Sequence, residues 1–131
     1  MTTYLLDANV LIALTVADHE HHERASSWAA TIDRFAVCPI VEGALVRFFV
    51  RVGESAHAAA EVLRALHAMP RCTFWPDALS YADAALGQVR GHRQVTDAYL
   101  VALAAAQPDA RLATFDLSLA RELPKGTVAI P

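Results

Sequence analysis

Apolar runs of strand length alternate along this chain with stretches whose apolar residues recur every three or four positions. The first run, residues 4–6, ends at Asp7, and an apolar stretch with helix-like spacing resumes almost at once. This pattern predicts a strand that carries Asp7 to the edge of a sheet, with a helix directly after it. Because Asp7 stands where a helix N-cap would stand, capping and chemistry are both open for it at this point.

The same alternation continues to the end of the chain. Further strands are expected at residues 35–38, 72–75, 111–115 and 127–130, and helices at residues 25–32, 39–52, 54–69, 81–89, 97–106 and 117–121. Asp18 and Thr96 are the predicted caps of two of these helices. Such alternation is typical of a three-layer α/β/α sandwich with a mostly parallel central sheet, here of four to five strands, whose ligands bind at the carboxyl ends of the strands.

The predicted helices over residues 39–52 and 54–69 follow one another with no strand between them, so we expect a helical hairpin. Plotted at about 100° per residue, Glu42 falls at the margin of the apolar face of the first helix, and Arg47 and Arg51 lie opposite that face. The apolar face consists of Val41, Leu45, Phe48, Phe49 and Val52. We therefore expect the Glu42 carboxylate to lie toward the interior.

Composition narrows the class of protein. The 131 residues are 55% hydrophobic and 19% charged, which favours one compact domain over residues 1–131. No apolar run approaches the roughly 18 residues that a bilayer-spanning helix needs, and no signal peptide is recognisable, so a cytoplasmic location without membrane contact is expected.

Cys38 and Cys72 are expected to be buried thiols rather than a disulfide. The formal net charge of −3 means that any nucleic acid would be bound through a local basic patch or bound cations.

Three histidines stand among acids in residues 18–24. A solvated helix start, with acids near the positive end of the helix dipole, explains this run better than a histidine metal site does.

Four other acidic residues stand at similar points of the predicted fold, just after a strand or at the start of a helix. Asp7 and Asp116 each follow a predicted strand, Glu42 lies one helical turn beyond another, and Asp97 opens the most apolar helix. Each alone has an ordinary role as a cap, a first-turn acid or a surface residue. Together they converge on the carboxyl edge of the sheet.

Clustered carboxylates indicate a cation. Two of them within about 4 Å repel by about 4 kcal/mol at an effective dielectric constant of about 20. Only oxygen ligands are available at these positions, which favours Mg²⁺ or Mn²⁺ over zinc. Such a site typically supports phosphoryl chemistry, in which the metal orients a water nucleophile. Asn9 and Thr114, two residues from Asp7 and Asp116, are candidate supporting groups, although both also suit turns.

The four segments that contain these acids resemble the signature segments of the PIN-domain ribonucleases, in particular the VapC toxins of bacterial toxin–antitoxin pairs. The resemblance spans the whole chain and is carried, in order, by residues 5–12, 39–42, 96–100 and 113–116. It implies a single PIN-like nuclease domain in which Asp7, Glu42, Asp97 and Asp116 bind Mg²⁺ or Mn²⁺, supported by Asn9 and Thr114. It further implies cleavage of RNA, a homodimer, and inhibition by a cognate antitoxin.

The resulting hypothesis is a metal-dependent endoribonuclease that acts as the toxin of such a pair. Candidates for a basic rim that contacts RNA phosphates are Arg47, Arg51, Arg90 and Arg93, whose alternative role is ordinary solvated surface. Two other functions remain open: an RNA- or antitoxin-binding module with a vestigial site, and a phosphatase similar to the haloacid dehalogenases. The phosphatase ranks low because its second aspartate is replaced here by Asn9 and no lysine occurs before Lys125.

Overall fold

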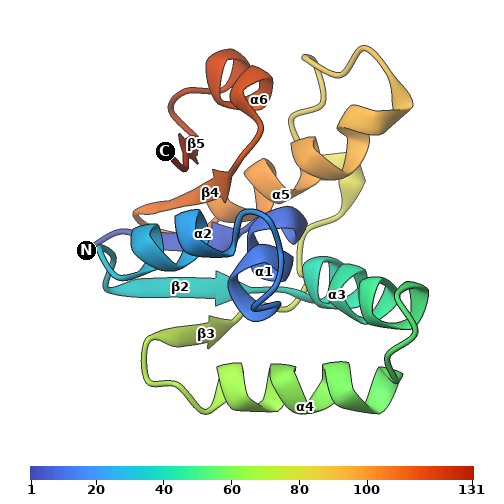
Figure 1. The fold of residues 1–131 in the computed structure, drawn as a ribbon. Helices are drawn as coiled ribbons and strands as arrows, with labels where there is room; N and C mark the ends of the chain where they lie inside the picture. Colours follow the sequence, from blue (N-terminus) through green and yellow to red (C-terminus); the bar gives the residue numbers. More distant parts are fainter.

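The computed structural model describes residues 1–131 and contains one five-stranded, wholly parallel sheet in the order β3-β2-β1-β4-β5 (Figure 1). The strands are β1 (Thr3–Leu6), β2 (Arg34–Val37), β3 (Cys72–Phe74), β4 (Ala110–Thr114) and β5 (Thr127–Ala129). All five were expected from the sequence to within two residues. The strands pair in parallel because helices make every connection between them.

Six helices connect the strands. They are α1 (Ala8–Thr15), α2 (His22–Ala29), α3 (Pro39–Arg51), α4 (Ala56–His67), α5 (Val95–Ala105) and α6 (Leu117–Glu122). In Figure 1, α1 and α2 lie in front of the sheet and α5 lies behind it. The predicted three-layer sandwich is therefore confirmed.

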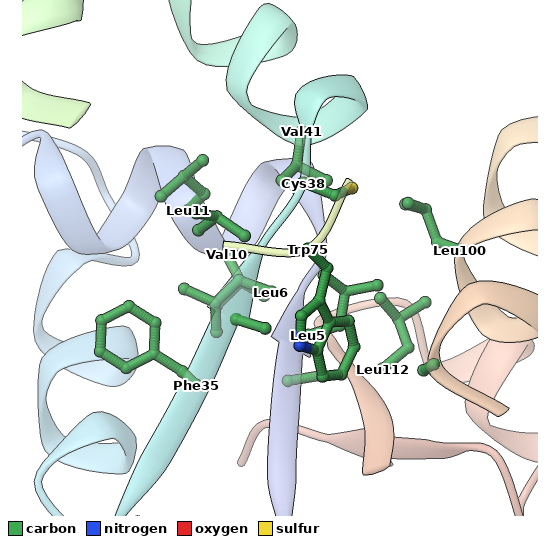
Figure 2. Close-up of a cluster of buried hydrophobic side chains, with 14 of the residues drawn as sticks. Leu5, Leu6, Val10, Leu11, Phe35, Cys38, Val41, Trp75, Leu100 and Leu112 are labelled. Carbon is green, nitrogen blue, oxygen red and sulfur yellow. The ribbon is translucent and has the colours of Figure 1, made fainter. Parts of the chain in front are cut away.

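The core lies between the sheet and the helices on both of its faces. On one face of the sheet, Leu5 of β1 is fully buried beside Leu112 of β4, its neighbour in the register, and near Trp75 (Figure 2). Phe35 of β2 and Val10 of α1 belong to the same buried cluster. Strands that are covered on both faces need apolar side chains on both, which explains why residues 4–6 and 35–38 read as continuous apolar runs.

The register of the central strands determines which side chains meet at the carboxyl edge. β1 pairs with β4 so that Leu6 is opposite Ala113, and the amide of Asp7 donates a hydrogen bond of 3.0 Å to the Ala113 carbonyl. The backbone ladder thus extends one residue beyond β1. It brings Asp7 beside the residues that follow β4, which include Asp116.

The predicted hairpin is formed by α3 and α4, which pack against each other. Pro39 occupies the first turn of α3, as expected, and Gly53 follows the end of that helix with a φ of 90°, a conformation that favours glycine. Ser55 caps α4, because its hydroxyl accepts a hydrogen bond from the Ala58 amide at 3.0 Å. Leu66 is the large α4 side chain buried against the rest of the molecule.

Several local predictions were wrong. The helix expected over residues 81–89 is only a 3₁₀ turn at Tyr81–Asp83, because no residue of this segment is buried and helix formation therefore gains no packing. Asp18 does not cap α2, which begins after His21. Thr96 lies inside α5 rather than before it, since a 3₁₀ turn at His92–Gln94 leads directly into that helix. Val52 is 55% exposed because α3 ends before it.

Both cysteines are free thiols. Cys38 is buried, as expected, but the prediction that Cys72 is buried was wrong, because Cys72 lies on the edge strand β3 and is only partly covered. No helix combines the length and the apolarity that crossing a membrane would require.

Candidate active site

Asp7 is held at the carboxyl edge of the sheet by contacts to both of its carboxylate oxygens. Oδ1 accepts a hydrogen bond of 2.8 Å from the Ala8 amide at the start of α1, and Oδ2 accepts one of 2.9 Å from the Thr114 hydroxyl. The residue is only 7% exposed. Burial raises the pKa of this carboxyl above its ordinary value and the nearby charge of Asp116 raises it further, while the two hydrogen bonds oppose the increase. Asp7 is therefore both a helix cap and a buried acid next to another acid.

Thr114 connects Asp7 to Asp116. Its hydroxyl donates to Asp7 and accepts a hydrogen bond of 3.0 Å from the Asp116 amide, and the residue is fully buried. Asp116 in turn caps α6, where its Oδ1 accepts a hydrogen bond of 3.1 Å from the Leu119 amide. One hydroxyl thus fixes the relative positions of two carboxylates that are 109 residues apart in the chain.

Asp97 is the third acid of this group, and it belongs to the helix layer behind the sheet. It lies in the first turn of α5, behind the sheet, and is partly buried. Burial raises the pKa of this carboxyl to about 6, and the charges of Asp7 and Asp116 contribute to the increase. Asp97 is therefore close enough to Asp7 and Asp116 for their charges to affect its protonation.

A small cavity of about 50 Å³ opens beside this group of acids. Its polar lining includes Asp97 and Asp116 together with Gln88, Gln94, Ser118 and Glu122. The last four had not been singled out from the sequence, because the segments that carry them come together only through the packing of α5 against β4. The cavity offers oxygen and amide groups and no thiol.

Glu42, the fourth predicted acid, points elsewhere. It lies in the first turn of α3, and its Oε2 contacts His67 Nε2, at the end of α4, at 2.6 Å. The Glu42 side chain is 15% exposed, so the expectation that it lies toward the interior holds. However, its charge raises the pKa of Cys72 on β3, and it is not among the charges that shift the pKa of Asp7 or Asp97. The structure thus groups Asp97 with Asp7 and Asp116, whereas Glu42 is held by His67 and does not line the cavity beside Asp97 and Asp116.

No three side chains among the histidines, cysteines, aspartates and glutamates form a group tight enough to hold a metal ion as they stand. The three histidines of residues 19–22 form no such group either. His22 Nδ1 contacts the Ala13 carbonyl at 2.8 Å, and Arg24 contacts both His21 and the Phe115 ring. They are parts of the local packing around the start of α2.

The remaining predicted residues lie on the exposed surface, outside the cavity that Asp97 and Asp116 line. Asn9 is exposed and lines a groove of about 620 Å³ between α1 and α3 together with Arg47 and Arg51. Arg90 and Arg93 lie in the exposed segment before α5, where the Arg90 amide donates a hydrogen bond of 2.5 Å to Gln94 Oε1. All four arginines are exposed, and none of them lines the cavity beside Asp97 and Asp116.

His67 carries no signal in the sequence that marks it as a functional residue. Its partner Glu42 is 25 residues away, and His67 follows no strand and belongs to no recognisable motif. Only the way in which α4 packs back on α3 could reveal this pair.

Comparison with known proteins agrees with this architecture. The model of the PIN domain family matches residues 4–122. Ribonuclease VapC29 of Mycobacterium tuberculosis is 53% identical over 130 residues, which cover 98% of this chain and 97% of that protein.

Two solved structures share the fold. A toxin–antitoxin complex from Klebsiella pneumoniae superposes with a TM-score of 0.71 at 17% identity, covering 98% of each chain. The structure of Mycobacterium tuberculosis VapC20, described as a toxin that cleaves the sarcin–ricin loop, superposes with a TM-score of 0.69 at 18% identity, covering 91% of this chain and 94% of the other. With the family match and the 53% identity to a VapC ribonuclease, these findings show that the chain belongs to the PIN-domain family and, within it, to the VapC ribonucleases.

Proposed function

We propose that this VapC protein cleaves RNA internally, using Mg²⁺ or Mn²⁺ held by Asp7, Asp97 and Asp116 with Glu42 as a fourth ligand. The observation that carries the proposal is that the charges of Asp7, at the end of β1, and Asp116, after β4, raise the pKa of Asp97 at the start of α5. Neighbouring carboxylates that repel one another are stabilised in their charged form by a cation. An all-oxygen donor set suits Mg²⁺ and Mn²⁺.

The residues of the chain have separable tasks in this proposal. Thr114 fixes the orientation of Asp7, and it also holds the Asp116 backbone, so that two ligands are positioned before any cation arrives. Asp116 uses Oδ1 to cap α6, which leaves Oδ2 for the cation. A divalent ion bound here would supply charge neutralisation at the phosphate and a water of lowered pKa. Asn9, which is exposed two residues beyond Asp7, would act as a supporting polar group of the site in this proposal.

RNA is the proposed substrate because the 53% identical relative is named a ribonuclease. The acidic net charge restricts phosphate contacts to local cations, for which Arg47 and Arg51 on one side and Arg90 and Arg93 on the other are the candidates. Because bacterial RNA is found in the cytoplasm, we also propose that the protein acts there. Family membership favours this nuclease over the phosphatase alternative.

The decisive experiment compares the wild type with Asp7→Asn on RNA in the presence of Mg²⁺ or Mn²⁺. We expect cleavage to fall by at least about 100-fold, because the amide removes the buried negative charge while its shape stays nearly the same. Asp33→Asn, an exposed aspartate just before β2, serves as the matched control and should cleave normally. Undiminished cleavage by Asp7→Asn would refute the assignment.

We further propose that the protein is the toxin of a toxin–antitoxin pair and forms a homodimer. The K. pneumoniae complex with the same fold supports an antitoxin partner. Induced expression of the wild type should arrest growth, and expression of Asp7→Asn should not. Light scattering at two concentrations tests the dimer, which a strictly monomeric mass would contradict.

A further inference from the structure

Glu42 of α3 and His67 of α4 are in direct contact, and both of these side chains are ionisable. The 2.6 Å separation of Oε2 and Nε2 is that of a charge-assisted hydrogen bond, in which the ring nitrogen donates and the carboxylate accepts. The side chain of Glu42 is 15% exposed and that of His67 is 41% exposed. The contact is therefore partly shielded from water on the glutamate side.

His67 is itself held in place. Its ring packs edge-on against Phe74 of β3, with ring centroids 5.6 Å apart. The contact with His67 thus holds Glu42 toward α4 and β3. By contrast, Thr114 holds Asp7 at the end of β4, and Asp97 and Asp116 line a cavity to which neither Glu42 nor His67 contributes.

We propose that His67 is a positioning residue that holds the Glu42 carboxylate away from the three aspartates, so that Glu42 joins them only when it leaves His67. This inference rests on the proposed function, in which Glu42 is the fourth ligand. A carboxylate that accepts a hydrogen bond from His67 in its present position has to break that bond before it can reach the aspartates. The contact therefore lowers the affinity of the site for a divalent cation.

Binding of Mn²⁺ to the whole protein, measured by calorimetry in the absence of RNA, tests the inference without recourse to activity. We expect His67→Ala to bind Mn²⁺ roughly threefold to tenfold more tightly than the wild type, as expected for the loss of one partly exposed charged hydrogen bond. His57→Ala is the matched control, because His57 lies on the same helix, is 81% exposed and contacts Glu61 instead. Its affinity should equal that of the wild type.

Two further variants separate positioning from a merely structural role. His67→Gln keeps a side-chain N–H donor and should restore the wild-type affinity. In a Glu42→Gln background, His67→Ala should no longer change the affinity, because the ligand on which it acts has lost its charge. If His67→Ala fails to fold, His67→Phe keeps a ring against Phe74 without a donor and should show the same tighter binding.

The possible outcomes distinguish this inference from the proposed function. A wild type that binds no Mn²⁺, or binding that Asp7→Asn leaves unchanged, would overturn the proposed function and this inference with it. Binding that Asp7→Asn abolishes, combined with an unchanged or weakened affinity in His67→Ala and His67→Phe, would overturn only the role of His67.

Discussion

The strand-borne acids and the hairpin-borne acid of this protein are placed in different ways. Asp7 is one residue beyond β1, its amide still belongs to the sheet ladder, and both of its carboxylate oxygens are occupied by close neighbours. Glu42 lies on α3, and its carboxylate is fixed by one contact, to a side chain of α4. The first arrangement is set by backbone register, and the second depends on how two helices pack.

The difference shows how precisely a position in the sequence can locate a functional group. A short side chain at a strand end has few rotamers and inherits the geometry of the sheet, so Asp7 and Asp116 meet where the parallel register places them. A glutamate on a helix has three side-chain torsions, and its direction depends on which partners surround it. Variants that weaken either region test this contrast.

The largest expected effect is on the hairpin. Leu66 is the large α4 side chain that is buried, and truncating it leaves a cavity between the hairpin and the rest of the molecule. We expect Leu66→Ala to lower the free energy of unfolding by about 3 kcal/mol in urea titrations. Val50→Ala on α3 removes a side chain that is 55% exposed and should change it by less than about 0.5 kcal/mol. Equal effects of the two variants would mean that α4 does not depend on this contact.

The next effect is on the strand-borne acids. Thr114→Val keeps the shape of the side chain but removes the hydroxyl that serves Asp7 and the Asp116 amide, both of which lose a partner. We expect a loss of about 2 kcal/mol of unfolding free energy. RNA cleavage should also fall, because Asp7 is no longer oriented. Thr114→Ser retains the hydroxyl and should preserve activity, and a Thr114→Val protein as active as the wild type would contradict the positioning role.

A smaller effect is expected at the start of α4. Ser55→Ala removes the hydroxyl that accepts from the Ala58 amide, and the variant should lose about 1 kcal/mol of unfolding free energy in thermal or urea unfolding. Amide hydrogen exchange should accelerate in the first turn of α4 and stay unchanged in β1 and β4. Acceleration throughout the sheet would show that the two regions are not separable.

The subtlest effect is a pH dependence of stability. The pKa of Asp97 is about 6 in the folded protein, above its ordinary value of 3.8, so its contribution to stability is fully present below pH 3.8 and is lost as the pH rises through 6. In a chelator-containing buffer, Asp97→Asn should therefore melt at a higher temperature than the wild type at pH 8 and at nearly the same temperature at pH 4. Asp33→Asn should show no such divergence. A lower melting temperature for Asp97→Asn at pH 8 would contradict the repulsion among the three aspartates.

Much of this molecule follows from the order of its residues. The apolar runs predicted all five strands, and the central ones are apolar throughout because both of their faces are covered. The positions of Asp7 and Asp116 followed from the strand ends. Pro39, Gly53 and the periodicity of residues 39–69 were enough to predict the hairpin. These features are local, and local propensity and periodicity encode them directly.

Long-range packing decided the rest. The segment over residues 81–89 has helical composition but finds nothing to bury against, so only one 3₁₀ turn forms. The Thr114 hydroxyl bridges two acids because β1 and β4 are neighbours in the sheet although they are far apart in the chain. Whether Glu42 faces the aspartates or His67 depends on the return of α4 across α3, and the sequence does not specify the rotamer of a side chain whose partner comes from another helix.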